Sequence, residues 1–356
     1  YTTLNTYFVR MKEKVANALN GYLCVYKPAD LSLNGLKKNI VKRICAQANA
    51  VTGWPKLPTI DVPLIDEHPT SGALVVVGRK RQIDYSQHAL VVGETFRVED
   101  LRLEELHPLE TTSSGVCVFG VNGGVDKLEE LRRQQWTNQW RVECVLGRET
   151  HMHEIKGKVT KKENYDHVSK QKVMKLLSKV KGDYRRMAFE LAEVEMQSSQ
   201  AFQIASRGIP RPKLPDSQLV VNLKLLLFKL PYLAMMIDSI GETDAWLRCM
   251  VNEFGLSLDT TASPVRLIRR AVGPFRPEHA LIERQLSLQN IVDNIGLTDR
   301  LLREYPYDRN VVIETSKDTS EEGFVKRKEI LDRMVANELL PDDFDAMRPA
   351  WPRDYA

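Results

Sequence analysis

The chain has 356 residues, 43% of them hydrophobic, so it can bury one large core or two ordinary ones. This composition excludes intrinsic disorder as the default state. The formal net charge is +4, but residues 303–356 carry 9 basic and 13 acidic side chains, which leaves +8 on the rest. A basic body suits a polyanionic partner, although ordinary solvated lysine faces explain the charge equally well.

The cysteines and the hydropathy of the chain indicate its redox compartment and whether it spans a membrane. The five cysteines are scattered without a CxxC pair, which is typical of a reducing compartment. The most apolar stretch, residues 223–237, contains Lys224, Lys229 and Pro231 and is shorter than the roughly 20 residues of a membrane span. We therefore expect buried strands there and no membrane span.

The first predicted elements are a helix and a strand. Residues 4–20 have apolar positions at helical spacing and end at Gly21. Residues 21–26 form a short apolar strand, which a turn connects to a helix ending near residue 45. Residues 51–72 are rich in proline and polar residues and predict a surface loop. Strands are predicted next at 73–77 and 88–92.

The elements after this loop mix strands and helices irregularly. In chain order they are a strand at 116–121, a helix at 127–136, a strand at 140–146, a helix at 169–181, strands at 187–196, 219–228 and 233–238, and a helix at 243–254. Because strands and helices do not alternate strictly, the pattern favours an α+β fold with a mostly antiparallel sheet.

Common cofactor and metal motifs are missing from the sequence. There is no GxxxxGK[ST] phosphate loop, GxGxxG turn, GxSxG elbow or HExxH pair. His151 and His153 lack further ligands at a regular spacing, so we expect a solvated turn. The prediction is therefore no metal and no cofactor.

Two segments carry the strongest functional signal. Gly21-Tyr-Leu-Cys-Val-Tyr-Lys-Pro28 and Leu106-His-Pro-Leu-Glu-Thr-Thr-Ser-Ser-Gly-Val-Cys-Val-Phe-Gly120 resemble the two N-terminal motifs of the TruB family of pseudouridine synthases. Residues 140–147, 200–208 and 247–255 are similar to later elements of that family. The resemblance covers roughly residues 20–295, and within the family it is greatest to the animal mitochondrial paralogue.

This resemblance implies a domain organisation. Residues 21–295 would form a pseudouridine-synthase domain with a mixed, mostly antiparallel sheet, flanking helices and a central RNA-binding cleft. Residues 1–20 would be an N-terminal helix. Residues 296–356 would be an acidic extension that either docks on a protein partner or packs back on its own domain, and no PUA domain is expected.

The family's catalytic aspartate, stacking tyrosine and arginine correspond to Glu110, Trp140 and Arg248. Glu110 keeps the charge but adds a methylene, and a shift of about 1 Å at a reacting group can cost about 100-fold in rate. Trp140 keeps a stacking face but offers only an N–H donor where tyrosine has a hydroxyl. Arg248 keeps the planar fork that clamps a carboxylate. These changes favour retained binding over retained catalysis.

Basic side chains are the candidates for contact with structured RNA. They are Lys27, Lys156, Lys158, Lys161, Lys162, Arg269 and Arg270. Lys27, followed by Pro28, has an alternative interpretation as part of a rigid turn.

The resulting hypothesis is an RNA-binding protein without isomerase activity. It would act as an assembly factor or stable component of a ribonucleoprotein in the mitochondrial matrix, such as the mitoribosome. The alternative is an active pseudouridine synthase acting on mitochondrial tRNA, rRNA or mRNA. An unrelated enzyme that reuses the fold is a third possibility.

Overall fold

The computed structural model describes residues 13–52, 57, 59–88, 91, 93, 95–214, 217–305 and 307–312, and the statements below concern these residues. Tyr1–Val312 forms one compact unit. Of the helix predicted at 4–20, residues 13–18 are described and are helical. The part of the acidic extension beyond Val312 lies outside the described residues.

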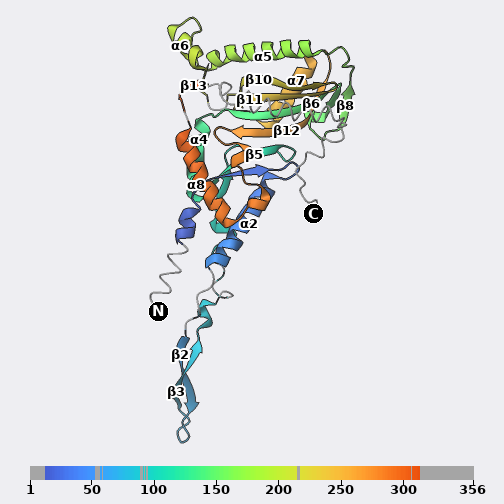
Figure 1. The fold of residues 1–356 in the computed structure, drawn as a ribbon. Coiled ribbons are helices and arrows are strands. Elements are labelled where there is room, and N and C mark those ends of the chain that lie inside the picture. Colours follow the sequence, from blue (N-terminus) through green and yellow to red (C-terminus); the bar gives the residue numbers. More distant parts are fainter. Residues whose placement is uncertain are drawn as a thin grey trace. The chain divides into compact units, whose positions relative to one another are not determined.

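A mixed sheet forms the centre of the described unit (Figure 1). Its strands are, in spatial order, β1 (Gly21–Lys27), β5 (Ser114–Val121), β12 (Ala262–Val272), β6 (Asn138–Leu146), β11 (Tyr232–Ile240) and β10 (Leu219–Lys229), with β4 (Leu103–Glu105) also paired to β5. Only the β5–β12 pair among them is parallel. The predicted α+β fold with a mostly antiparallel sheet is confirmed.

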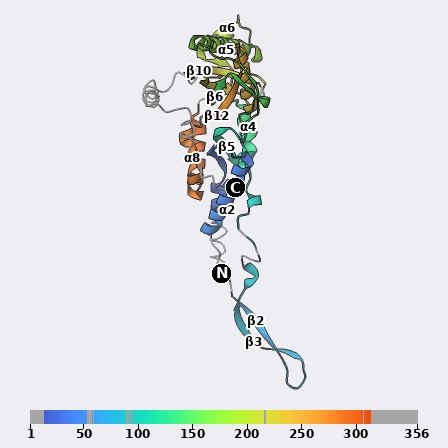
Figure 2. The same cartoon turned by 90° about the vertical axis from the view of Figure 1, so that its right-hand side faces the viewer.

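Six described helices accompany the sheet. They are α2 (Leu33–Thr52), α4 (Leu128–Arg133), α5 (Lys170–Leu191), α6 (Ser199–Arg207), α7 (Asp244–Leu256) and α8 (Leu288–Glu304). Helix α5 packs on β10, α7 packs on β12, and α8 packs on β1 and α2. The positions of α5 beside β10 and of α8 beside α2 can be followed in both views (Figures 1 and 2).

Both faces of β5 are covered, and all of its residues are buried. Cys117 and Phe119 point into the larger core cluster, which includes buried side chains of α2 and α8. Val116 and Val118 point into a second cluster that includes Leu128 of α4. Alternate side chains of a strand point to opposite faces, and here both faces are apolar. This arrangement explains why β5 reads as a continuous apolar run.

Helix α5 corrects one strand prediction. A strand was predicted at 187–196, but the helix that starts after its N-cap Ser169 continues to Leu191. Val173, Leu177 and Ala188 are its buried residues, at spacings compatible with one helical face. The apolar residues near the end of α5 therefore follow the helical period, and no strand forms there.

Three two-stranded sheets complete the described structure. They are β2 (Thr59–Glu67) with β3 (Leu74–Ile83), β7 (Arg148–Thr150) with β8 (Val159–Lys162), and β9 (Ile209–Pro210) with β13 (Val311–Val312). Strand β2 occupies part of the segment predicted as a loop, so that prediction is wrong for Thr59–Glu67, whereas residues 68–72 form the turn that joins β2 to β3. The described residues within the strand predicted at 88–92 form no strand.

None of the helices in the described part of the chain is long and apolar enough to span a membrane.

Helix α8 continues past residue 295, where the domain was predicted to end. Thr298 is buried, and its hydroxyl donates a 2.5 Å hydrogen bond to the Tyr22 carbonyl of β1. Leu301 and Leu302 pack against the second core cluster, and β13 pairs with β9. The folded unit therefore uses residues up to Val312, while the exact domain limits stay a prediction.

A truncation pair tests this dependence. A chain ending at Val312 should keep the stability of the full chain, since it retains α8 and β13. A chain ending at Gly296 should lose about 3 kcal/mol or more of unfolding free energy, because Leu301 and Leu302 lose their burial. Urea denaturation followed by circular dichroism measures both. Equal midpoints for the two truncations would show that α8 beyond Gly296 contributes nothing to the fold.

Candidate functional site

The loop before β5 is anchored by a buried arginine. The parallel pairing of β12 with β5 sets Arg269 beside Gly115. The Arg269 side chain donates from Nε to the Val116 carbonyl at 2.8 Å, from Nη1 to the Pro108 carbonyl at 3.2 Å and from Nη2 to the His107 carbonyl at 3.1 Å. Arg269 thereby fixes the path of the loop that carries Glu110.

Lys27 holds the far end of the same loop. Its Nζ donates to the Ser113 carbonyl at 2.6 Å and to the Thr111 and Pro28 carbonyls at 3.1 Å each. Burial lowers the pKa of Lys27 to about 8, although the charge of Asp244 opposes this shift. Because its ammonium group donates to three carbonyls, Lys27 stabilises the loop and has no N–H left to contact solvent.

Lys27 and Arg269 were predicted to contact RNA, and their burial corrects that prediction. Lys27 is 0% exposed and Arg269 is 1% exposed, so neither side chain presents a surface to a ligand. Their burial depends on contacts between distant segments. Lys27 on β1 and Arg269 on β12 both donate to carbonyls of the loop before β5, and a buried cation needs such partners.

Glu110 and Arg248 form an ion pair, as the family resemblance implied. The Glu110 carboxylate contacts Nη1 of Arg248 on α7. The Glu110 side chain is 42% exposed and that of Arg248 is 13% exposed, so the carboxylate is the part that faces solvent. Burial also lowers the pKa of the Arg248 guanidinium. The pair places a carboxylate and a fixed cation at the protein surface.

Asp244 is a second carboxylate beside this pair, and the sequence interpretation missed it. Its Oδ2 accepts a hydrogen bond from the Glu110 backbone N–H at 3.1 Å. Asp244 and Arg248 lie one helical turn apart on α7, so both reach the same loop. Burial raises the pKa of Asp244, while the nearby Ser113 side chain and the charges of Arg269 and Lys27 oppose the rise. The four-residue spacing from Arg248 was the signal available in the sequence.

Trp140 is enclosed, which corrects its prediction as an open stacking platform. It is 1% exposed, and its Nε1 donates a 2.6 Å hydrogen bond to Glu242. The Arg269 guanidinium lies 5.5 Å from the centroid of its ring. In this conformation no ring face is open to a nucleobase. Burial raises the pKa of Glu242, while its hydrogen bonds from Trp140 and Asn138 oppose the rise.

The remaining predicted RNA contacts lie away from the core. Lys156, Lys158, Lys161 and Lys162 are all exposed near hairpin β7–β8. Lys156 pairs with Asp30 and Lys161 with Glu163, each at 2.6 Å. Exposed pairs of this kind are weak enough to exchange for a phosphate. Arg270 is half-buried. Contact of these side chains with RNA stays a prediction.

The described residues contain no group of three or more His, Cys, Asp or Glu side chains placed to hold a metal ion. His151 and His153 lie in a short 3-10 turn between β7 and β8, and the buried Nδ1 of His153 lacks a hydrogen-bond partner in the described structure.

Comparison with known proteins relates part of the chain to one family. Residues 106–243 match the family described as TruB family pseudouridylate synthase (N terminal domain). This match begins at the Glu110 loop and contains β5, β6, β10 and β11. Residues 106–243 of this chain are therefore similar to the N-terminal domain of that family.

Similarity to individual TruB-type proteins extends over most of the chain. Mitochondrial pseudouridylate synthase TRUB2 of Homo sapiens is 28% identical over 280 residues, which cover 78% of this chain and 83% of that protein. The Xenopus tropicalis TRUB2 is 26% identical over 277 residues, covering 78% and 85%. A chain of a solved Cbf5-Nop10-Gar1 complex is similar with a TM-score of 0.41 and 12% identity. That match covers 79% of this chain and 56% of the other.

Proposed function

We propose that this TruB-type protein binds structured RNA and has little or no isomerase activity. The enclosure of Trp140 is the observation that carries this proposal. Making pseudouridine requires a uridine to leave its stack and enter a pocket beside a carboxylate and an aromatic ring. In this chain the ring at the family's stacking position is covered, whereas Glu110 remains at the surface.

Opening the Trp140 site would be costly. A base could reach the indole only if Arg269 or the loop moved, and the three carbonyl hydrogen bonds of Arg269 oppose that movement. Each hydrogen bond from a charged group contributes about 1.5–3 kcal/mol. Glu110, longer than aspartate by a methylene and paired with Arg248, adds a misplaced carboxylate. Both features disfavour catalysis more than binding.

Retained RNA binding is supported by charge. Residues 1–302 carry a net charge of +8, and exposed lysines cluster near β7–β8. Lysines that neutralise phosphates release condensed counterions, so the affinity should fall steeply with salt. The names of the TRUB2 relatives place them in mitochondria. The proposed setting is therefore a ribonucleoprotein of the mitochondrial matrix, such as the mitoribosome, in which the acidic extension meets a protein partner.

A second candidate function is active pseudouridine synthesis on mitochondrial tRNA, rRNA or mRNA. The retained contact between Glu110 and Arg248 is the observation that favours it. Asp244, held against the Glu110 backbone, adds a further carboxylate to that site.

An isomerase assay separates the two candidates. Uridine-containing mitochondrial RNA is incubated with the protein, and carbodiimide-reactive, base-resistant pseudouridine is measured. We expect none above background from the unmodified chain, although the RNA is bound. Glu110→Asp with Trp140→Tyr should give more product than either change alone, because together they restore both residue types of the family's motif and their effects need not add. Thermal denaturation of each variant checks that the fold survives.

The outcome against the proposal is equally distinct. Sustained turnover by the unmodified protein that Glu110→Ala abolishes would establish the active enzyme. The Glu110→Ala variant also serves as the background control for chemical labelling.

A further inference from the structure

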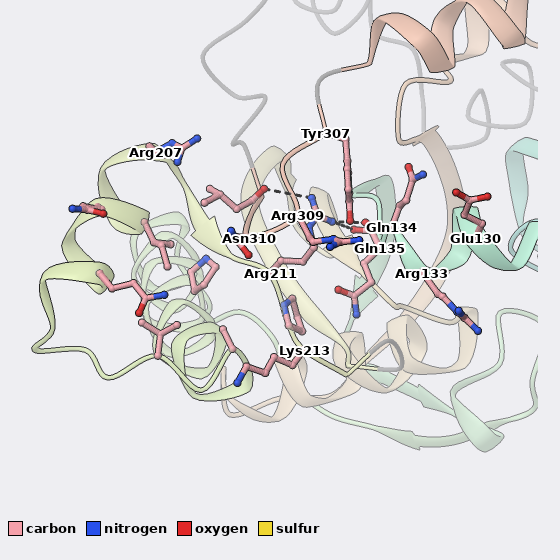
Figure 3. A pocket seen from close by; sticks show the side chains of 18 residues that line it. Glu130, Arg133, Gln134, Gln135, Arg207, Arg211, Lys213, Tyr307, Arg309 and Asn310 are labelled. Atoms are coloured by element: carbon pink, nitrogen blue, oxygen red, sulfur yellow. Dashed lines mark hydrogen bonds between the residues drawn. The ribbon is translucent and has the colours of Figure 1, made fainter.

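A basic hollow lies apart from the Glu110 loop (Figure 3). It has a volume of about 960 Å³ and is lined by residues from α4, from α6, from β9 and the segment after it, and from residues 307–311. None of the lining residues belongs to the Glu110, Arg248 and Asp244 site. Ligand-binding cavities usually measure about 300–1,000 Å³, so this hollow can hold more than a single ion.

The charged side chains that line the hollow are mostly positive. Its charged side chains are Arg133, Arg207, Arg211, Lys213 and Arg309, with Glu130 the one carboxylate of the lining. Amide side chains, among them Gln200 and Gln203, supply further hydrogen-bonding groups. A cavity lined by one sign of charge concentrates ligands of the opposite sign.

Arg211 is a fixed cation in this hollow. Its Nη1 donates to the Gln134 carbonyl at 2.5 Å and the Gln135 carbonyl at 2.6 Å, and its Nε donates to the Asp308 carbonyl at 3.2 Å. The guanidinium lies 4.9 Å from the centroid of the Tyr307 ring. Its Nη2 also donates to the Val311 carbonyl at 3.4 Å, so four of its five N–H groups are used and one is left for a ligand. No carboxylate is in salt-bridge contact with Arg211 among the described residues, so its fixed positive charge attracts an anion, while direct phosphate contacts come mainly from the exposed cations around it.

The surrounding cations are available at low cost. Arg207 pairs with Asp308 at 2.8 Å, but the Arg207 side chain is 66% exposed. Lys213 pairs with Glu193, and both of these side chains are also largely exposed. Pairs as exposed as these contribute about 1 kcal/mol or less, so a phosphate can replace the carboxylate. Arg133 and Arg309 are exposed as well.

We propose that this hollow binds the phosphodiester backbone of a single-stranded RNA segment, as a second contact besides the Glu110 face. Arginine presents a planar fork that matches phosphate geometry in bidentate fashion, and four of the five cations here are arginines. The glutamines and the Tyr307 ring add groups that bind base edges and faces. An acidic peptide would use the charges but not this aromatic and amide lining. The inference rests on the proposed RNA-binding function.

The test compares two charge-matched double variants in full-length protein. Arg133→Glu with Arg309→Glu reverses two exposed charges of the hollow. Lys38→Glu with Lys42→Glu reverses two exposed charges of α2. Fluorescence anisotropy measures the affinity of each for a labelled oligouridylate across a salt series. We expect the first variant to bind about 10-fold more weakly and the magnitude of its salt slope to fall by about 1.4, because two phosphate contacts to a single strand are lost. The α2 variant should change the affinity less than about 2-fold.

Three results would overturn the inference, and they are distinguishable. Equal losses in both variants would mean that only total charge matters, while the proposed RNA-binding function stands. Absence of binding by the unmodified protein to both the oligouridylate and the mitochondrial RNA of the isomerase assay would remove that function too. Polyglutamate that binds the unmodified protein more tightly than the oligouridylate, but not the hollow variant, would assign the hollow to an acidic protein partner. Photo-crosslinking of 4-thiouridine RNA to unmodified protein, expected within residues 200–213 or 307–311, is a readout independent of mutation.

Discussion

Replacing Gly115 by alanine will lower the free energy of unfolding by about 3 kcal/mol or more, through backbone strain and overpacking. Gly115 is the second residue of β5, the strand that follows the Glu110 loop, and its φ of +131° disfavours any side chain. A Cβ there would lie 2.2 Å from the Arg269 carbonyl oxygen and 2.6 Å from the Arg269 nitrogen. These neighbours are backbone atoms of a central strand, so they cannot move aside cheaply. Urea denaturation gives the measurement.

The matched control is Gly182→Ala in helix α5. A Cβ at Gly182 meets no atom within 4 Å, so alanine should raise stability by up to about 1 kcal/mol through its better helix propensity. If Gly115→Ala changed the unfolding free energy by less than about 0.5 kcal/mol, the close parallel approach of β5 and β12 would be wrong.

The second large effect is expected for Arg269→Met. Methionine fills much of the same volume but leaves the carbonyls of His107, Pro108 and Val116 without their buried donor. A loss of about 3 kcal/mol in unfolding free energy is expected, because buried acceptors lose hydrogen bonds from a charged group. Denaturant unfolding monitored by tryptophan fluorescence reports the loss, since Trp140 lies beside Arg269.

The control for this variant is Arg102→Met at the surface. Arg102 pairs with Asp126 at 2.9 Å, and both side chains are more than half exposed. Its replacement should change stability by less than about 0.5 kcal/mol. If Arg269→Met instead kept full stability and weakened RNA binding, the original prediction of Arg269 as a direct RNA contact would be restored.

The sequence alone determined many of the local elements and the pairing of Glu110 with Arg248. Apolar runs marked β1, β5, β10 and β11, and helical spacing with a threonine cap marked α7. The order of motifs related Glu110 and Arg248, which the fold then brings into contact across 138 residues of chain. These features depend on patterns within short segments, and such patterns are visible in sequence.

Only the tertiary structure decided which of the predicted residues are accessible. Two cations and an aromatic ring are residue types common in RNA-binding sites, yet Lys27, Trp140 and Arg269 are all buried. Their burial follows from the pairing of β12 with β5, through which Arg269 reaches a carbonyl 153 residues away. The hollow around Arg211 likewise joins segments distant in sequence, from α4 to β13. Burial depends on which strands and loops meet, and because those contacts are non-local, no single segment contains the information.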